Sequence, residues 1–407
     1  MLKPILILCL LTVSYYCQAQ NTWINKYTDP ILQDQKGSFS NLAVLAPALK
    51  DVSVVTLGEQ THFDGATFDA KIQLIKYLHE QLGFNILAFE SGYFDCTKAS
   101  QLLSKNRMPG TLKDAVFGVW DNQSLAELEH YVIATQQTAH PLILTGFDSQ
   151  FSGKLSGKYL LSDLAAYLDK VGASSITDQT DWKDFKSAVQ RQLKYSNFYK
   201  KPLAKDTLLI AKYSKTITNQ MDSRSAATDQ HEHYFWRKVI SNLVYDTKHR
   251  YSGKNFRDSV MAVNLLSLIT ERYPNEKVIC WGATSHFIYN PKQINSKGYE
   301  DFLPMGDELH QKLGTKLFTI GFTSYEGRAG SLITHQLKKP TPNSYEDLLG
   351  QTAYHYAFTN LRAAATAKND STVIESRMLG NTFNSMDLSK VIDGLFYIKT
   401  AYPPRSK

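Results

Sequence analysis

The chain has 407 residues, of which 43% are hydrophobic and 20% charged, values typical of a globular protein. Its formal net charge of +7 is mild for this length, and no block of Lys and Arg argues for nucleic-acid binding. Four cysteines are too few for a disulfide scaffold, although Cys96 and Cys280 could pair. The length accommodates one large α/β domain with an insertion, or two domains.

The first twenty residues, MLKPILILCLLTVSYYCQAQ, contain one early lysine, an apolar run, and the small residue Ala19 near a suitable cleavage point. This pattern is typical of a secretory signal peptide, because the apolar core is short for a bilayer span. We therefore expect residues 1–20 to be removed and residues 21–407 to be exported, as a periplasmic or secreted protein without stable membrane insertion. An uncleaved anchor is the alternative interpretation.

Five segments consist of a continuous apolar, β-rich run that ends in polar residues or glycine. Continuous apolar character favours strands buried on both faces, as in a parallel sheet. The segments are VSVVTLGE (52–59), NILAFES (85–91), PLILTGFD (141–148), KVICWGATSH (277–286) and KLFTIGFTS (316–324). The sequence thus predicts an α/β fold with a largely parallel sheet flanked by helices.

A helix is predicted between the first two strands. Apolar residues recur at helical spacing from Phe68 to Leu82, and Gly83 follows where a left-handed C-cap belongs. Residues 52–91 therefore form a predicted strand–helix–strand unit. From about 155 to 275 the pattern instead predicts successive amphipathic helices without an intervening strand. We interpret this stretch as a helical insertion that forms one wall of a cleft.

Polar side chains stand where the predicted strands end, and ligands of open parallel sheets bind outside the carboxyl ends of the strands. These residues are Glu59 and His62, Glu90, Asp148, and His286. If the first two strands are neighbours, Glu59 and Glu90 are about 5 Å apart, one strand spacing. Such proximity would raise the proton affinity of one carboxylate. A histidine held by a carboxylate can take a proton from water, which suits base-catalysed hydrolysis.

Other interpretations of these residues remain open at this point. Each could have a structural duty, as a helix cap or a satisfied hydrogen-bonding group. Two His and two Glu also suit zinc or iron, although no H-E-x-x-H or paired-Cys spacing occurs. The adjacent residues of HEH (231–233) do not share one helix face. A serine hydrolase is disfavoured because the chain has no G-x-S-x-G motif.

The stretch LGEQTHFDGATFDAKIQLIKYLHEQLGFNILAFES resembles the signature of the erythromycin esterase family. That signature is built around G-E-x-T-H, a helix with a basic residue, then G-F and a strand ending in Glu. Further motifs follow in the family's order, so the resemblance spans nearly the whole mature chain. They are GVWDNQSLAELEHYV, LTGFDSQ, FRDSVMAVNLL, VICWGATSHF, MGDELHQKLGTKLFTIGF, NLR (360–362) and IDGLFYI.

The resemblance implies a hydrolase that opens the lactone ring of a macrolide such as erythromycin, without a metal or cofactor. By this analogy His62 is the general base, Glu59 steers it, and Glu90 and His286 line the site. Lys71 would bind substrate and steady a carboxylate or the developing oxyanion. Such an enzyme would inactivate an antibiotic and confer resistance.

Arg257 is a further substrate-binding candidate by the same resemblance, although it could equally form a structural pair with Asp258. The chain departs from the family's pattern at Ala283 and Thr284, which replace His-Asn, and at Asn360. Lysine also stands where many members have arginine. An ester other than a macrolide is therefore an alternative substrate. A haem- or metal-binding protein of the same broad superfamily and a metal-dependent hydrolase are the alternatives of other classes.

Overall fold

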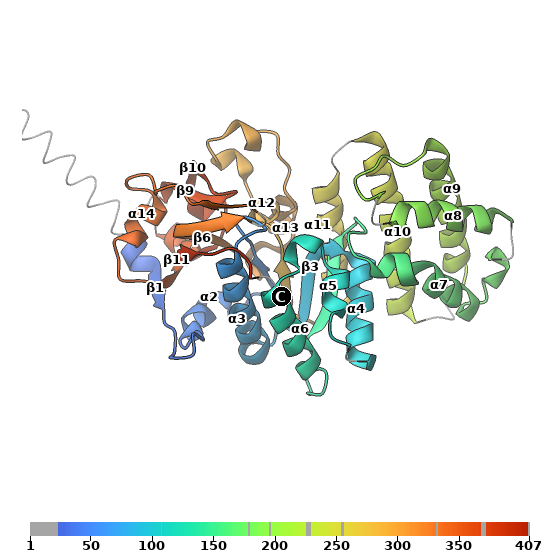
Figure 1. Cartoon of the computed structure of the whole chain (residues 1–407), viewed down its shortest axis with the longest axis horizontal. Coiled ribbons are helices and arrows are strands. Elements are labelled where there is room, and N and C mark those ends of the chain that lie inside the picture. Colours follow the sequence, from blue (N-terminus) through green and yellow to red (C-terminus); the bar gives the residue numbers. More distant parts are fainter. Residues whose placement is uncertain are drawn as a thin grey trace, which may run out of the picture. The chain divides into compact units, whose positions relative to one another are not determined.

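The computed structural model describes most of the chain, and the predicted signal peptide (1–20) lies outside the described residues. The described ranges are 23–106, 108–177, 180–194, 197–224, 229–253, 256–330, 333–367 and 372–405. The chain forms two compact units (Figure 1). The first unit combines Met1–Leu82 with Gly282–Arg405, and the second unit contains Gly83–Trp281.

The first unit contains a mixed sheet. Within it the strand order is β1-β8-β11-β6-β2, and β7 pairs with β6. Strands β2, β6 and β11 run parallel to one another, whereas β8 is antiparallel to both β1 and β11. The strands are β1 (Thr28–Ile31), β2 (Val54–Leu57), β6 (Leu317–Gly330), β7 (Thr334–Gln336), β8 (Tyr356–Asn360) and β11 (Gly394–Ala401). A separate antiparallel pair comprises β9 (Val373–Leu379) and β10 (Thr382–Asp387).

Helices pack around the strands of the first unit, and α3 is the longest of those described there (Figure 1). Asp64 begins α3, because Asp64 Oδ1 accepts from the Thr67 amide at 3.2 Å, and Gly83 ends it with φ +71°. The helices are α2 (Ala46–Leu49), α3 (Gly65–Leu82), α12 (Thr284–Phe287), α13 (Met305–Leu313), α14 (Tyr345–Gly350) and α15 (Leu361–Thr366).

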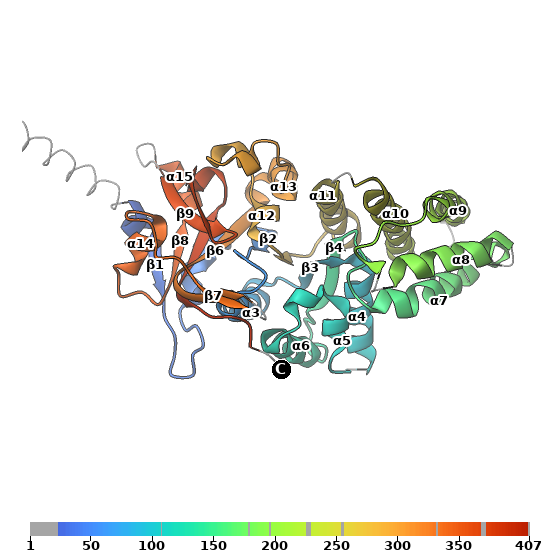
Figure 2. The ribbon, with the colours of Figure 1, turned by 45° about the horizontal axis from the view of Figure 1, so that its top comes forward.

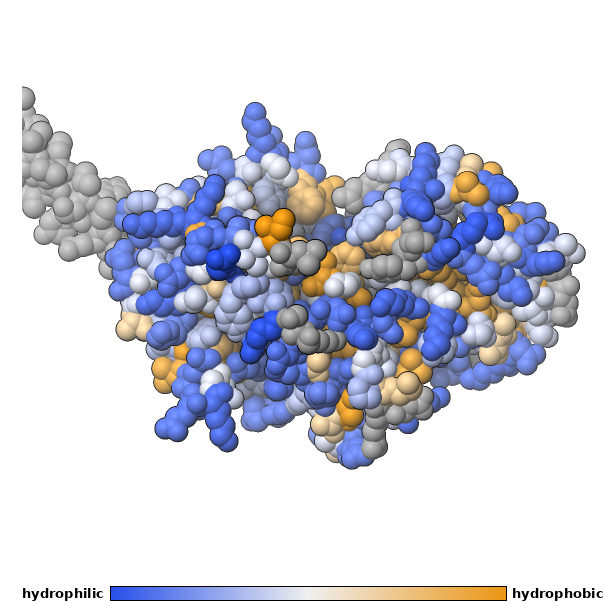
Figure 3. Space-filling model, in the orientation of Figure 1, coloured by the Kyte–Doolittle hydropathy of each residue, from blue (hydrophilic) through white to orange (hydrophobic). Residues whose placement is uncertain are grey.

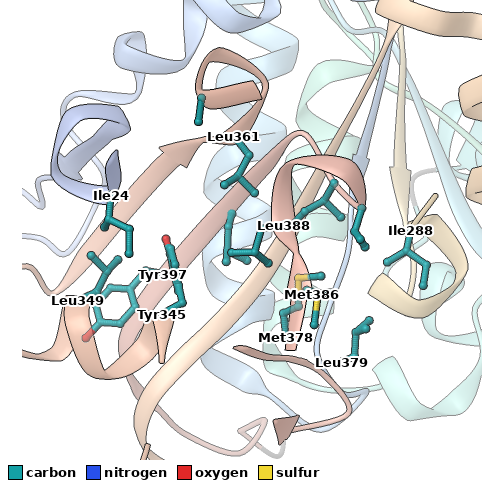
Figure 4. Packing of buried hydrophobic residues seen from close by; sticks show 14 of the residues in the cluster. Ile24, Ile288, Tyr345, Leu349, Leu361, Met378, Leu379, Met386, Leu388 and Tyr397 are labelled. Atoms are coloured by element: carbon teal, nitrogen blue, oxygen red, sulfur yellow. The ribbon is translucent and has the colours of Figure 1, made fainter. Parts of the chain in front are cut away.

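A hydrophobic core fills the space between the C-terminal strands and the helices of the first unit (Figure 4). Met378 and Met386 bring the β9–β10 pair into this core, while Tyr397 contributes from β11. All three side chains are at most 1% exposed. Burial of apolar area on this scale is the main source of stability for such a unit.

The second unit has a three-stranded parallel sheet, in the order β5-β3-β4. Helix α11 lies on one side of β3 and β4, whereas α4 and α6 lie on the other (Figure 2). The strands are β3 (Ile86–Gly92), β4 (Ile143–Asp148) and β5 (Val278–Trp281). The helices next to them are α4 (Tyr93–Asn106), α5 (Thr111–Ala115), α6 (Gln123–Thr135) and α11 (Arg257–Ser267), which continues into a π-helical turn (Leu268–Arg272).

Four further helices follow β4 before α11 and group together in the second unit (Figure 1). They are α7 (Leu155–Lys170), α8 (Thr180–Leu193), α9 (Ala204–Asp222) and α10 (Gln230–Ser252). No strand is assigned among the described residues between β4 and β5. These helices fall in the range of the predicted insertion, whose role as a cleft wall stays a prediction.

The predicted fold class is confirmed, because mixed, mostly parallel β-structure is flanked by helices and all five expected strands form. Each of these strands has a continuous buried run, as the apolar sequences predict. One expectation is wrong. Strand β3 pairs with β4 and β5, so both of its edges are used and β2 is not its neighbour.

Hydrophilic residues predominate on the face shown in Figure 3, and apolar residues form small patches. No helix in the described ranges combines the length and the apolar character that a bilayer crossing requires. Cys96 and Cys280 are both buried and remain free thiols, so the disulfide that the sequence left open does not form.

Candidate active site

Two backbone segments meet closely at the carboxyl end of β2. The amide of Thr284 donates to the backbone carbonyl of Glu59 at 3.0 Å. A Cβ on Gly58 would lie 2.9 Å from Thr284 Cα and 2.5 Å from its Oγ1, so only glycine permits this approach. The contact places the segment that contains His286, on α12, beside the turn that follows β2.

The carboxylate of Glu59 lies between a histidine and a lysine. Glu59 Oε1 is 2.7 Å from His62 Nδ1, and Glu59 Oε2 accepts from Lys71 Nζ at 2.6 Å. Lys71 Nζ also donates to the carbonyl of Gly282 at 3.2 Å. The side chains of Glu59 and Lys71 are fully buried, whereas that of His62 is 30% exposed. We call Glu59, His62 and Lys71 the histidine cluster.

This geometry determines which ring nitrogen of His62 can accept a proton. A Glu59 carboxylate can only accept, so His62 Nδ1 must be the donor in their hydrogen bond. In the neutral ring Nε2 is then the basic nitrogen, which is the tautomer required of a general base. Lys71 offsets the negative charge of Glu59, and its second hydrogen bond, to Gly282, further compensates the desolvation of this buried ion pair.

A second buried carboxyl, Asp64, braces the turn that carries His62. It accepts from Gln60 Nε2 at 2.6 Å and from Thr67 Oγ1 at 2.8 Å, in addition to capping α3. Gln60 also donates to Ser324 Oγ on β6 at 3.0 Å. Burial raises the pKa of Asp64, against the lowering effect of the hydrogen bonds from Thr67 and Gln60. Asp64 was not among the predicted site residues, although an Asp directly before a helical pattern is an N-cap signal.

A separate polar cluster forms in the second unit at the ends of β3 and β4. Arg257 Nη2 donates to Glu90 Oε1 and to Asp148 Oδ2, each at 2.7 Å, and Nε donates to Asp148 Oδ2 at 3.0 Å. Glu90 and Asp148 are nearly fully buried. Burial alone would lower the pKa of Arg257, but the charges of Asp148 and Glu90 outweigh it, so this pKa is raised. We call these three residues the arginine cluster.

Helix α11 holds Arg257 in place through a polar side chain two turns further on. Asn264 Nδ2 donates to the carbonyl of Phe147, next to Asp148, and to Asn242 Oδ1 on α10, both at 3.0 Å. Asn264 thus fixes α11 to β4 and to α10. The R-D-x-x-M-A-x-N motif contains both Arg257 and Asn264 at the spacing that this arrangement requires.

The structure therefore divides the predicted site residues between the two units. Glu59, His62 and Lys71 come together in the first unit, and Glu90 and Arg257 come together in the second. His286 is half-buried on α12. The expected pairing of Glu59 with Glu90 across neighbouring strands rested on a β2–β3 pair, which does not form. Asp148, which stands at the end of a predicted strand, is the second carboxylate partner of Arg257.

The second histidine of the HEH sequence, His233, contacts a tyrosine and an aspartate. His233 is buried on α10, with Nδ1 3.2 Å from Tyr167 Oη and Nε2 3.2 Å from an Asp222 oxygen. Among the described ranges, no group of three or more His, Cys, Asp and Glu side chains is arranged to hold a metal ion.

Comparisons with known proteins agree with the motifs. The erythromycin esterase family model matches residues 79–401. The Bacillus subtilis protein named "Putative hydrolase YbfO" is 28% identical, with 99% of this chain and 97% of that protein covered. Erythromycin esterase type I of Escherichia coli is 23% identical, with 74% and 77% covered. The solved structure of an erythromycin esterase variant in its open conformation has a TM-score of 0.68 at 17% identity, covering 93% of this chain and 98% of that one. The chain belongs to the erythromycin esterase family, and this membership supports hydrolase chemistry.

Proposed function

We propose that the protein opens the lactone ring of macrolides such as erythromycin, with a water molecule activated by His62. The observation that carries this proposal is the buried Glu59 carboxylate held between Lys71 and His62 Nδ1. Family membership supports ester hydrolysis, and the named activity of the Escherichia coli relative supports a macrolide as the substrate.

In the proposed reaction His62 Nε2 removes a proton from water as the oxygen attacks the lactone carbonyl carbon. The imidazolium that forms is stabilised by Glu59, which keeps its orientation because Lys71 binds its other oxygen. The tetrahedral intermediate then collapses, the bond from the carbonyl carbon to the ring oxygen breaks, and the proton passes from His62 to the leaving alkoxide. General base catalysis of this kind contributes about 10²–10⁴-fold.

The first experiment incubates the purified protein with erythromycin and follows the mass of the antibiotic, with and without a chelator. A gain of one water that persists in chelator is the expected result. His62→Ala, at a 30% exposed position, should keep its fold and abolish this gain. Normal turnover by His62→Ala would remove His62 from the mechanism, and an unchanged antibiotic mass would refute the macrolide substrate.

We also propose that the protein is exported, because residues 1–20 have the composition of a signal peptide. Cell fractionation followed by mass measurement of the recovered chain tests this directly. Recovery of a chain that lacks about twenty residues from the extracytoplasmic fraction is expected. Recovery of the full-length chain from the cytoplasm would refute it.

A further inference from the structure

A cavity of about 510 Å³ lies among helices α4, α7 and α10 of the second unit (Figure 1). Its lining comes from α4, the C-terminal half of α7, the first two turns of α10, and Arg272 at the end of the π-helical turn. None of the three residues of the arginine cluster lines it. Cavities of about 300–1,000 Å³ commonly hold small organic ligands, so this one is large enough for a ligand of its own.

Aromatic rings form the apolar wall of this cavity. Trp236 on α10 stacks with Tyr167 at a centroid distance of 5.7 Å and meets Phe235 edge to face at 5.2 Å. The ring of Phe94, on α4, lies 6.1 Å from those of both Trp236 and Phe235. All four side chains line the cavity, and each is at most 6% exposed, so packing fixes the surface that they present. A rigid aromatic wall of this kind binds a flat apolar group at low entropic cost.

Arg272 supplies a positive charge beside the aromatic wall. It is half-buried, and its guanidinium carbon lies 5.1 Å from the centroid of Phe235. Its Nε donates to Tyr273 Oη at 2.9 Å, and Nη1 donates to the carbonyl of His231 at 3.5 Å. Among the described residues, no carboxylate pairs with Arg272 and nothing accepts from Nη2. A half-buried guanidinium with free N–H groups favours an anion, and a carboxylate matches its planar fork.

The backbone that carries Arg272 is unusual. Arg272 is the last residue of the π-helical turn that follows α11. The amide of Tyr273 donates to the carbonyl of Leu268, five residues earlier, at 2.8 Å. Turns of this type are rare and are frequently found at functional sites, because the wider turn changes the direction of the side chains around it. The local backbone therefore supports the same conclusion as the unpaired charge.

The other charges of the lining are largely compensated within it. Lys98 pairs with Asp163, and Lys170 pairs with Glu232, each at 2.5 Å. The side chain of Asp229 caps the N-terminus of α10. In total the lining has four basic and three acidic residues, so one positive charge is in excess. This excess excludes a cationic ligand and again favours an anion.

We propose that this cavity binds an aromatic carboxylate, whose rings pack against Trp236 and Phe94 and whose carboxylate pairs with Arg272. The rings account for the aromatic wall, and the carboxylate accounts for the guanidinium that no described acidic residue neutralises. The site is additional to the proposed hydrolysis and does not rest on it.

The first test measures binding of 4-benzoylbenzoate to the purified protein by calorimetry, beside the neutral analogue 4-benzoylbenzamide. The carboxylate should bind about tenfold more tightly, because only the carboxylate forms a charge-assisted hydrogen bond with Arg272. Arg272→Gln should remove this preference by weakening carboxylate binding about tenfold, while affinity for the amide stays within about twofold. Arg237→Gln is the matched control, because Arg237 on the same helix as Trp236 pairs with Asp222 and does not line the cavity.

Equal affinity of the wild type for carboxylate and amide, or no binding of the carboxylate, would overturn the proposal even if Arg272→Gln failed to fold. The same holds if Arg237→Gln lost as much affinity as Arg272→Gln. A second test irradiates the bound 4-benzoylbenzoate, whose ketone crosslinks to neighbouring C–H groups, and maps the labelled peptides. Labels on α4, α7 or α10 are expected, and labels confined to other segments would refute the site. Neither test depends on ester hydrolysis, so failure of the proposed function would leave both interpretable.

Discussion

Lys71 is the residue whose substitution should be most informative, because its ammonium has no contact with bulk solvent and faces a buried carboxylate. Removing one partner of a buried ion pair typically costs about 3–5 kcal/mol, since the other charge stays desolvated. Lys71→Ala should therefore destabilise the protein by that amount and abolish hydrolysis. Lys71→Arg, which keeps the charge, should retain more of both. Urea unfolding and kcat/KM provide the two readouts, and equal losses in the two variants would argue against a charge role.

Arg257 differs from Lys71 in its geometry. Its planar guanidinium contacts two carboxylates through two nitrogens. A lysine ammonium cannot match this geometry, so Arg257→Lys should lower the free energy of unfolding by about 2 kcal/mol. Arg237, which pairs with Asp222 at the surface, is the matched control, and Arg237→Lys should change stability by less than about 0.5 kcal/mol. Similar unfolding midpoints for the two variants would contradict this difference.

At the scale of elements, the strands and α3 could be predicted from sequence because their signals are local. Continuous apolar runs identified the buried strands, and Gly83 marked the end of α3. The order of the strands could not be predicted, because β5 reaches the edge of β3 from almost two hundred residues further along the chain. The contact of Arg257 with Asp148 spans 109 residues, so no local pattern encodes it. Asp148 was identified by its place at a predicted strand end and Arg257 by the family resemblance, whereas their pairing is visible only in the structure.

The approach of α12 to the turn after β2 depends on one glycine. A Cβ at residue 58 would lie 2.9 Å from Thr284 Cα, so one backbone segment must move. Gly58→Ala should cost about 1–3 kcal/mol and reduce kcat/KM, because the movement displaces Glu59. Gly298→Ala, where no atom beyond the two neighbouring residues lies within 4 Å of the added methyl group, should leave both quantities nearly unchanged. Wild-type activity in Gly58→Ala would show that this contact does not position the histidine cluster.

At the scale of the whole molecule, the buried carboxyl of Asp95 makes the free energy of unfolding fall as pH rises. Burial raises the pKa of Asp95 to about 7, although the Ser156 amide lowers it by donating to Oδ1 at 2.7 Å. The native protein therefore holds this proton between about pH 4, where an unfolded Asp titrates, and pH 7. Because the unfolded chain binds fewer protons across that window, the stabilisation is complete below pH 4 and is lost as pH rises through 7.

Asp95→Asn tests this dependence, because an amide has nearly the shape of the protonated carboxyl and does not titrate. In wild type this group alone lowers the free energy of unfolding by about 1.4 kcal/mol per pH unit within the window. The stability of Asp95→Asn relative to wild type should therefore increase between pH 5 and pH 7, by about 2–3 kcal/mol. Urea unfolding at both pH values measures the difference, and other titrating groups cancel in the comparison. Parallel stability curves would mean that Asp95 is ionised in the native protein throughout this range, despite its burial in the first turn of α4.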